Sequence, residues 1–217
     1  MVNSTDHAQA SGHVIVIDDD ASVRRSLSTM LAREGYAITL YDCADAFLSN
    51  PVVPSPAVIL LDMRMPGMTG VGLQSQLQTL AKNVPVIFVS GDSRPEEIIV
   101  AMKQGAVDFL LKPFTAQAMM DVIQRAMRLS EIAVVEADKN LQVSERLQRL
   151  TPREMEVCHW MVRGYSNQQI AVLDGGASAT IKLHRARVMD KMGASTLPEL
   201  IDMLTGMEIP APQRQAS

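Results

Sequence analysis

Five short apolar runs, separated by helical patterns, occupy residues 13–114 and constrain the fold more than any other feature. The runs are HVIVID, AITLYD, AVILLDM, PVIFVSG and DFLLKPF. The third is apolar up to its aspartate, as expected of a strand buried on both faces. Helical spacing lies between the runs, at residues 21–35, 43–49, 70–81 and 95–104. Strands that alternate with helices predict a parallel sheet with helices on both faces.

Residues 115–150 have a different pattern. Apolar residues recur there at mostly helical spacing, with no Gly or Pro between them: Met119, Ile123, Met127, Val134, Leu141 and Leu147. Two interpretations stay open. Either a terminal helix is followed by a polar linker, or one continuous helix carries a stripe that faces a partner.

Residues 151–203 predict a compact unit made of helices. Thr151 and Glu154 form the pattern of a capping box, with proline at the first helical position, and Ser166 and Gln169 repeat it. A Gly-Gly pair at 175–176 precedes a basic helix, Gly193 ends that helix, and STLPELIDML predicts a last short one.

Composition excludes several classes of protein. The net charge of −4 argues against a protein that is basic throughout. The two cysteines, Cys43 and Cys158, are far apart, which argues against a disulfide framework and favours buried thiols in a reducing compartment. No signal peptide and no run of ~18 apolar residues is present, so we expect a cytoplasmic chain that does not enter a membrane. Residues 1–12 and 209–217 are expected to be disordered.

Polar side chains follow four of the five predicted strands. Asp18 and Asp19 follow the first, Asp62 the third, Ser90 ends the fourth and Lys112 the fifth. In a parallel sheet these side chains meet at one edge. Crowded carboxylates repel one another, and a hard cation such as Mg²⁺ relieves that repulsion. One carboxylate could then accept a phosphoryl group, with positive charge from Lys112 and a hydrogen bond from Ser90.

The segments VIDDD, LLDMRMPGMTG, VSG and GAVDFLLKPF resemble the receiver domain of two-component response regulators. The resemblance covers residues 13–128 and implies a five-stranded, flavodoxin-like, doubly wound parallel sheet. It implies phosphorylation of Asp62 by a sensor histidine kinase and a cis Lys112–Pro113 bond. It also implies a Mg²⁺ site made by Asp19, Asp62, the Arg64 carbonyl and, through water, Asp18.

The same resemblance implies a switch. Ser90 moves toward the phosphoryl group, Phe109 turns inward, and the face formed by residues 95–114 changes. Phosphorylation then favours a homodimer through the part of that face that holds Ile99 and Lys103. From the residues themselves, Arg64 and Asp92 flank the site and could pair across its mouth, which would limit attack by water. The alternative is two solvated side chains.

The segments LTPREMEVCHWMVRGYSNQQIA and TIKLHRARVMDKMGASTLPELI resemble the LuxR-type helix-turn-helix domain of FixJ/NarL-class response regulators. The resemblance places this DNA-binding domain at 149–208, after a helical linker at 129–148. Four of the five charged residues in 177–193 are basic, and we expect them to meet phosphates of double-stranded DNA. Lys182 and Leu183 would face base edges, and the phosphate contacts would be Thr180, Arg185 and Arg187.

Alternatives remain at this stage. The basic run could be an ordinary solvated face. The family usually has apolar residues at the positions of Asp174 and Gly176. The turn could therefore be loose, with Leu173 and Ile181 keeping the core, or the recognition helix could order only on DNA, or the domain could be impaired. An impaired domain would suit a phosphate sink or a protein-binding regulator.

A phosphatase with an aspartyl-phosphate intermediate is disfavoured, because Arg64 stands where its acid-base aspartate belongs. We therefore predict a DNA-binding regulator, not an enzyme, and the class allows contact with RNA polymerase.

Overall fold

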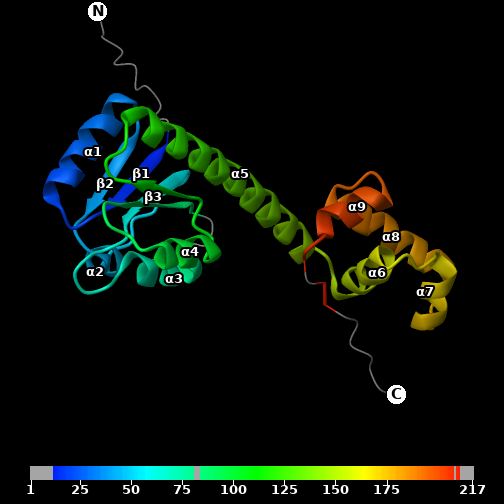
Figure 1. The fold of residues 1–217 in the computed structure, drawn as a ribbon. Helices are drawn as coiled ribbons and strands as arrows, with labels where there is room; N and C mark the ends of the chain where they lie inside the picture. The colour runs from blue at the N-terminus through cyan, green and yellow to red at the C-terminus, as the bar shows by residue number, and fades with distance from the viewer. Residues whose placement is uncertain (1–11, 81–83, 208, 211–217) are drawn as a thin grey trace, which may run out of the picture. The chain divides into compact units, whose positions relative to one another are not determined.

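The computed structural model describes residues 12–80, 84–207 and 209–210 of the 217-residue chain (Figure 1). The chain divides into two compact units, Met1–Val135 and Glu136–Ser217, and each is described by itself. Most residues of the two termini expected to be disordered, 1–11 and 211–217, lie outside the described ranges. Of the expected tail, Ile209 is described, and it packs against the core of the second unit.

The first unit is built on the predicted parallel sheet. Its strands follow the order β2-β1-β3-β4-β5, and every neighbouring pair is parallel. The strands are β1 (His13–Ile17), β2 (Ala37–Tyr41), β3 (Ala57–Asp62), β4 (Val86–Ser90) and β5 (Asp108–Leu111). The strand order reverses between β1 and β3, and in open sheets of this kind ligands bind at the carboxyl ends of the strands at such a reversal. The prediction of a doubly wound sheet is confirmed.

Five helices accompany the sheet: α1 (Ala21–Arg33), α2 (Ala44–Ser49), α3 (Gly70–Leu80), α4 (Pro95–Lys103) and α5 (Ala116–Gln148). The predicted helices at 43–49 and 95–104 agree with α2 and α4 to within one residue. The helix predicted at 70–81 is α3, and residue 81 lies outside the described residues. Cys43 was expected to be a buried apolar residue. It is half-buried, and its Sγ caps α2 by accepting the N–H of Ala46 at 3.4 Å.

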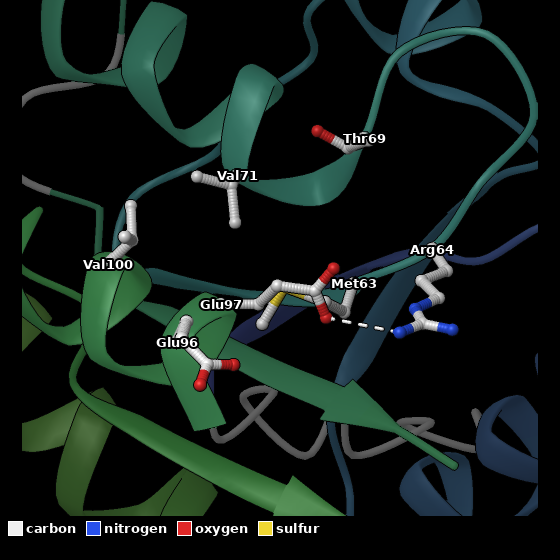
Figure 2. A pocket seen from close by; sticks show the side chains of 7 residues that line it. All are labelled: Met63, Arg64, Thr69, Val71, Glu96, Glu97 and Val100. Atoms are coloured by element: carbon white, nitrogen blue, oxygen red, sulfur yellow. Dashed lines mark hydrogen bonds and ion pairs between the residues drawn. The ribbon is translucent and has the colours of Figure 1, made fainter. Parts of the chain in front are cut away.

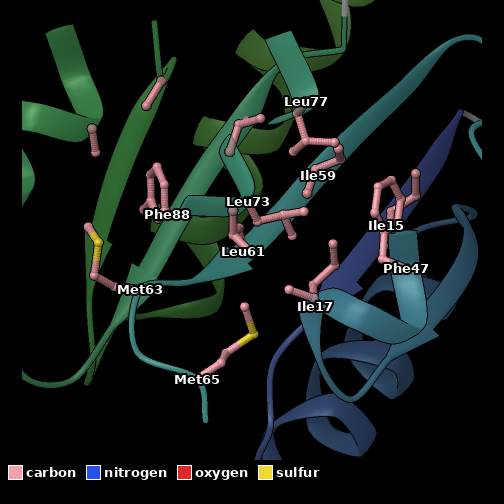
Figure 3. Close-up of a cluster of buried hydrophobic side chains, with 14 of the residues drawn as sticks. Ile15, Ile17, Phe47, Ile59, Leu61, Met63, Met65, Leu73, Leu77 and Phe88 are labelled. Carbon is pink, nitrogen blue, oxygen red and sulfur yellow. The ribbon is translucent and has the colours of Figure 1, made fainter. Parts of the chain in front are cut away.

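Two apolar cores lie on opposite faces of the sheet. Successive strand residues point to opposite faces. In β1 and β3, Ile15 and Ile59 therefore join one core, and Val14 and Val58 join the other. The first core includes side chains from α2, α3 and α4, and part of it is shown in Figure 3. The second includes side chains from α1 and α5. Alternation of period two thus divides the side chains of the strands between the two cores.

The long C-terminal segment of the first unit continues as one helix. α5 has 33 residues, which confirms that the helix is continuous, whereas the stripe that faces a partner stays a prediction. Met119, Ile123 and Met127 pack in the core of the first unit, and Val143 packs in the core of the second. Among the helices that the structure describes, none is long and apolar enough to cross a membrane.

The second unit contains α6 (Pro152–Val162), α7 (Asn167–Asp174), α8 (Ser178–Met192) and α9 (Leu197–Leu204). Both predicted capping boxes are present, at the starts of α6 and α7. Val157, Ile170, Ile181, Val188 and Leu200 bring all four helices into one core.

The glycine turn before α8 is closed by backbone hydrogen bonds. Gly175 adopts a left-handed conformation, with φ of 69°. Its N–H and that of Gly176 both reach the carbonyl of Ala171. This is a glycine-ended helix terminus, which an ordinary residue fits poorly. The expectation that Leu173 keeps the core is wrong, because its side chain is 48% exposed, whereas Ile181 is fully buried. The side chain of Asp174, whose apolar counterpart was expected to matter here, lies outside what the structure describes.

Candidate functional site

The expected residues do gather at the carboxyl ends of the central strands. Asp18 follows β1 directly and is 3% exposed, and Asp62 ends β3 and is 8% exposed. Lys112 follows β5, and its Nζ lies 2.9 Å from Asp18 Oδ2 and 3.6 Å from Asp62 Oδ1. Ser90, at the end of β4, is also buried, and its carbonyl accepts the N–H of Lys112. Four strands thus contribute side chains or backbone to one small site.

The three consecutive aspartates after β1 have different roles. Asp18 points into the site, while Asp19 is exposed beside it. Asp20 is the N-cap of α1, and its Oδ1 accepts the backbone N–H of Ser22 at 2.7 Å and that of Val23 at 3.4 Å. An aspartate after a strand is often just such a cap. The cap of α1 holds the turn that carries Asp18.

Burial and charge shift the ionisation of the central pair. Burial raises the pKa of Asp62, and the negative charges of Asp18 and Asp19 add to that rise, against the opposing effect of Lys112. Burial alone would lower the pKa of Lys112. The hydrogen bond to Asp18 and the charges of both carboxylates outweigh burial and raise it. The site therefore holds a surplus of negative charge around one ammonium group.

This surplus and the oxygen-only donor set fit a hard divalent cation. The charges of Asp18 and Asp19 both reach Asp62, and Asp62 Oδ2 accepts the backbone N–H of Arg64 at 3.2 Å. Among the described residues no three Asp, Glu, His or Cys side chains already form a metal cluster. A Mg²⁺ ion here would accordingly need carbonyl or water ligands besides carboxylates, which is its usual preference.

The side chain of Arg64 turns across the mouth of the site. Its two terminal nitrogens lie 2.9 Å from Asp92 Oδ2 and 3.3 Å from Glu97 Oε2. Figure 2 shows the second of these contacts. The pairing with Asp92 was one of two open alternatives, and the structure favours it over two solvated side chains. The contact of Arg64 with Glu97 was not predicted from the sequence. Glu97 lies in the first turn of α4, and its carboxylate also accepts the N–H of Arg94.

Gly70, which the strand-end pattern does not predict as a site residue, is required beside Asp62. A Cβ on Gly70 would lie 2.3 Å from the carbonyl oxygen of Asp62 and 2.9 Å from a ring carbon of Phe88. No side chain fits there without a shift of the backbone. The motif LLDMRMPGMTG ends on Gly70, so this last glycine is the sequence feature that could have predicted the close approach to Asp62.

Phe109 and the expected dimer residues lie beyond the carboxylate site. Phe109 in β5 is half-buried against the core next to α4. On α4, Ile99 is 53% exposed, and Lys103 is exposed as well. Val100 and Met102 add further exposed apolar surface. These residues form an outward face of α4 that is not covered within the unit.

In the second unit, α8 presents one buried face and one exposed face. Ile181, Val188 and Met192 are buried. The expected DNA contacts Thr180, Lys182, Leu183 and Arg187 are all exposed on the rest of the helix surface. The exposed face can therefore meet a groove while the buried face holds the helix in place.

Two basic residues of α8, Arg185 and Lys191, contact other parts of the second unit. Arg185 is half-buried, and its guanidinium donates to the carbonyl of Tyr165 at 3.0 Å. Lys191 was expected to meet phosphate. Its Nζ instead lies 2.5 Å from Glu154 Oε2 and 3.1 Å from the carbonyl of Arg149. Glu154 is 2% exposed. Its hydrogen bond with Lys191 lowers its pKa to about 2. Lys191 thus serves the core rather than a ligand.

The first unit has the sheet and the strand-end aspartates of a receiver domain, and the second has the helices of a helix-turn-helix domain. Residues 14–124 match the family model of the response regulator receiver domain, and residues 148–204 match that of the bacterial regulatory proteins of the luxR family. The chain belongs to the FixJ/NarL class of two-component response regulators, whose members are transcription factors rather than classical enzymes.

Individual relatives agree with this assignment. The chain is 37% identical over 190 residues to the transcriptional regulatory protein FixJ of Rhizobium meliloti, which covers 88% of this chain and 93% of FixJ. It is 34% identical over 195 residues to the tetrathionate response regulatory protein TtrR of Salmonella typhimurium, covering 90% and 93%. Among solved structures, the response regulator StyR aligns with a TM-score of 0.76 at 35% identity, covering 90% of this chain and 99% of StyR. Full-length FixJ from B. japonicum aligns with a TM-score of 0.57, also at 35% identity, covering 91% and 97%.

Proposed function

We propose that a sensor histidine kinase phosphorylates Asp62, and that this drives dimerisation and binding to an operator. The observation that carries the proposal is the convergence of Asp18, Asp62 and Lys112 in a chain that also carries the exposed basic face of α8. In this division, residues 13–128 are the receiver, 129–148 the linker and 149–208 the DNA-binding domain.

The chemistry follows from the positions of the side chains. A carboxylate oxygen of Asp62 attacks phosphorus, and the bond to the donor breaks on the opposite side. Lys112 stabilises the charge on the transferred oxygens. Asp18, Asp19, Asp62 and the carbonyl of Arg64 would hold Mg²⁺, with Asp18 acting through water. When bound, Mg²⁺ neutralises charge on the phosphoryl group.

The response follows from the groups beside the site. The hydroxyl of Ser90 approaches the new phosphoryl oxygens, and Phe109 turns into the space that this movement leaves. Ser90 ends β4 and Phe109 lies in β5, and Phe109 packs against the core that includes Ala101 of α4. The exposed side chains of Ile99 and Lys103 then pack against a second copy. Two copies bind two half-sites, and linkage of the two contacts raises the affinity for DNA.

On DNA, Lys182 and Leu183 contact base edges, and Thr180, Arg185 and Arg187 contact phosphates. Exposure supports these roles for four of the five residues. For Arg185 the structure supports a shared role, because its guanidinium also ties α8 to the carbonyl of Tyr165.

The test is DNA affinity at fixed salt, measured on random genomic fragments for the wild type and Asp62→Asn, with and without Mg²⁺ and acetyl phosphate. Asp45→Asn, an exposed carboxylate on α2, is the matched control. Selective binding that rises with acetyl phosphate in the wild type and the control, and not in Asp62→Asn, is expected. Absence of selective binding in every sample would overturn the proposal and favour a protein partner for the second unit.

A further inference from the structure

Helix α4 is attached to its unit by little apolar contact. Of its nine residues, Ala101 is the one that is buried, and Ile99, Val100 and Met102 are 53%, 43% and 43% exposed. Burial of apolar surface is the main force that holds a helix on a sheet. The placement of α4 therefore depends more than usual on its polar contacts.

Two glutamines of α3 supply such contacts at the C-terminal end of α4. The Nε2 group of Gln74 donates to the carbonyl of Ala101 at 3.1 Å, and that of Gln78, one turn later, donates to the carbonyl of Gln104 at 2.8 Å. The last carbonyls of a helix have no donor within the helix. The carbonyl of Ala101 also accepts the N–H of Ala106 at 3.1 Å, so Gln74 adds a second donor to it, while Gln78 supplies a donor to the carbonyl of Gln104.

The arrangement leaves one side of the buried amide unpaired. Gln74 is 2% exposed, and its Oε1 has no hydrogen-bond partner within the part of the chain that the structure describes. The Oε1 of Gln104 also has no hydrogen-bond partner among the described residues. A buried polar atom without a partner costs free energy. In this placement of α4, each of the two amides therefore leaves its carbonyl oxygen without a partner among the described residues.

The N-terminal half of α4 borders open space. A cavity of about 270 Å³ is lined by Met63, Val71 and Val100, with Thr69, Arg64, Glu96 and Glu97 at its edge (Figure 2). Close-packed interiors resist movement, whereas a helix beside a cavity can shift toward it without a clash. The ion pair of Arg64 with Glu97 holds this end of α4, and the two glutamines hold the other.

We propose that Gln74 and Gln78 form a polar clamp that keeps α4 in its resting placement, and that phosphorylation-driven dimerisation works against this clamp. We take this placement, in which Ile99, Val100 and Met102 are exposed, as the resting one. The inference rests on the proposed function, since it concerns the same dimer face. Both glutamines are positioning residues, because they act through α4 and do not touch the reacting atoms.

The test uses the full chain with three substitutions. Gln78→Ala removes one donor from an exposed position, and Gln74→Met replaces the buried amide with an apolar side chain of similar length. Gln76→Ala is the control, because Gln76 is exposed on the same helix and its Nε2 lies against Met68 Sδ. Sedimentation velocity gives the dimer dissociation constant without a phosphodonor, and hydrogen exchange gives the protection of amides 100–106.

Each clamp variant is expected to lower the dimer dissociation constant at least fivefold without phosphodonor and to speed exchange at 100–106 about tenfold. Gln76→Ala should match the wild type. Unchanged dimerisation and exchange in Gln78→Ala would overturn the clamp. Faster exchange over the whole receiver, without a change in dimerisation, would also overturn it, because that result indicates a structural role alone.

Wild type with Mg²⁺ and acetyl phosphate is measured in parallel. If this sample stays monomeric, the proposed function fails, and the exchange data on the unphosphorylated variants still decide whether the glutamines hold α4. If it dimerises and the clamp variants behave as wild type, the clamp alone fails.

Discussion

The guanidinium of Arg64 and the carboxylate of Asp92 lie 2.9 Å apart across the mouth of the aspartate site. Arg64 comes two residues after the proposed phosphoacceptor, and Asp92 comes two residues after Ser90. We expect the pair to cover the path by which water would reach a phosphoryl group on Asp62. Because the side chains are 42% and 88% exposed, the pair is a weak barrier rather than a lock.

Asp92→Ala should shorten the lifetime of the phosphoryl group. Removing the carboxylate frees Arg64 on that side and opens the path for water. An exposed pair contributes about 0.2–1 kcal/mol, so we expect dephosphorylation to be about 1.4- to fivefold faster. The measurement is loss of phosphate from the labelled full chain in the presence of Mg²⁺.

Glu96→Ala is the matched control for that measurement. Glu96 is an exposed acid that lines the same cavity, and the ion pairs of Arg64 join it to Asp92 and Glu97. Equal rates in Asp92→Ala and the wild type would remove the pair from any account of phosphoryl lifetime.

Lys112→Met should abolish most of the phosphorylation. The substitution leaves Asp18 and Asp62 buried together without their ammonium partner, and the charge of the transferred phosphoryl group loses a fixed cation. Loss of one such group commonly costs about 10²–10³ in rate. Phosphorylation by acetyl phosphate is the measurement, and Lys139→Met, an exposed lysine of α5, should leave the rate unchanged. A rate within threefold of the wild type would exclude this role for Lys112.

Pattern alone was enough for the sheet and for the convergence of its strand ends, because strand alternation and parallel topology leave few choices. It could not assign individual side chains to partners. Lys191 and Arg187 are both basic and four residues apart, yet one pairs with buried Glu154 and the other is exposed. Likewise, Asp18 pairs with Lys112 in the site, whereas Asp20 caps α1. Such choices depend on neighbours distant in sequence, which spacing within one helix or turn does not encode.

Two substitutions on α8 should separate base contacts from phosphate contacts. Lys182→Ala is expected to cost about 1–3 kcal/mol on the preferred operator and to relax the choice of sequence. Arg187→Ala is expected to weaken binding to all DNA alike and to reduce the slope of log affinity against log salt by about one. Titrations at several salt concentrations on operator and random DNA check both. The same salt slope in Arg187→Ala as in the wild type would contradict the phosphate contact.

The ion pair of Glu154 with Lys191 should make the second unit sensitive to acid. The pKa of Glu154 is lowered from 4.5 to about 2 in the folded chain. Its contribution to stability is therefore complete above pH 4.5 and declines as the pH falls toward 2. At neutral pH, Glu154→Gln should reduce the free energy of unfolding by roughly 1–3 kcal/mol. The difference from the wild type should shrink over the acid range.

Trp160 makes this measurement specific to the second unit. It is the single tryptophan of the chain and packs against that unit's core, so its fluorescence during urea unfolding reports on that core. Asp202→Asn, an exposed carboxylate on α9, should show no such pH-dependent difference. A gap between Glu154→Gln and the wild type that stays constant from neutral pH down to the acid range would contradict the assigned ionisation.

Ala177→Ser tests whether the glycine turn weakens the recognition helix. Ala177 is the N-cap of α8, with extended backbone angles and no side-chain cap. A serine there should stabilise the second unit by about 1 kcal/mol in the same fluorescence assay. Ala179→Ser, inside the first turn, should be neutral or destabilising by about 0.5 kcal/mol. Because α8 is already formed and anchored by buried Ile181, the added cap should change DNA affinity by less than about twofold. A gain of about fivefold would instead equal the whole cap energy and show that the helix orders only on DNA.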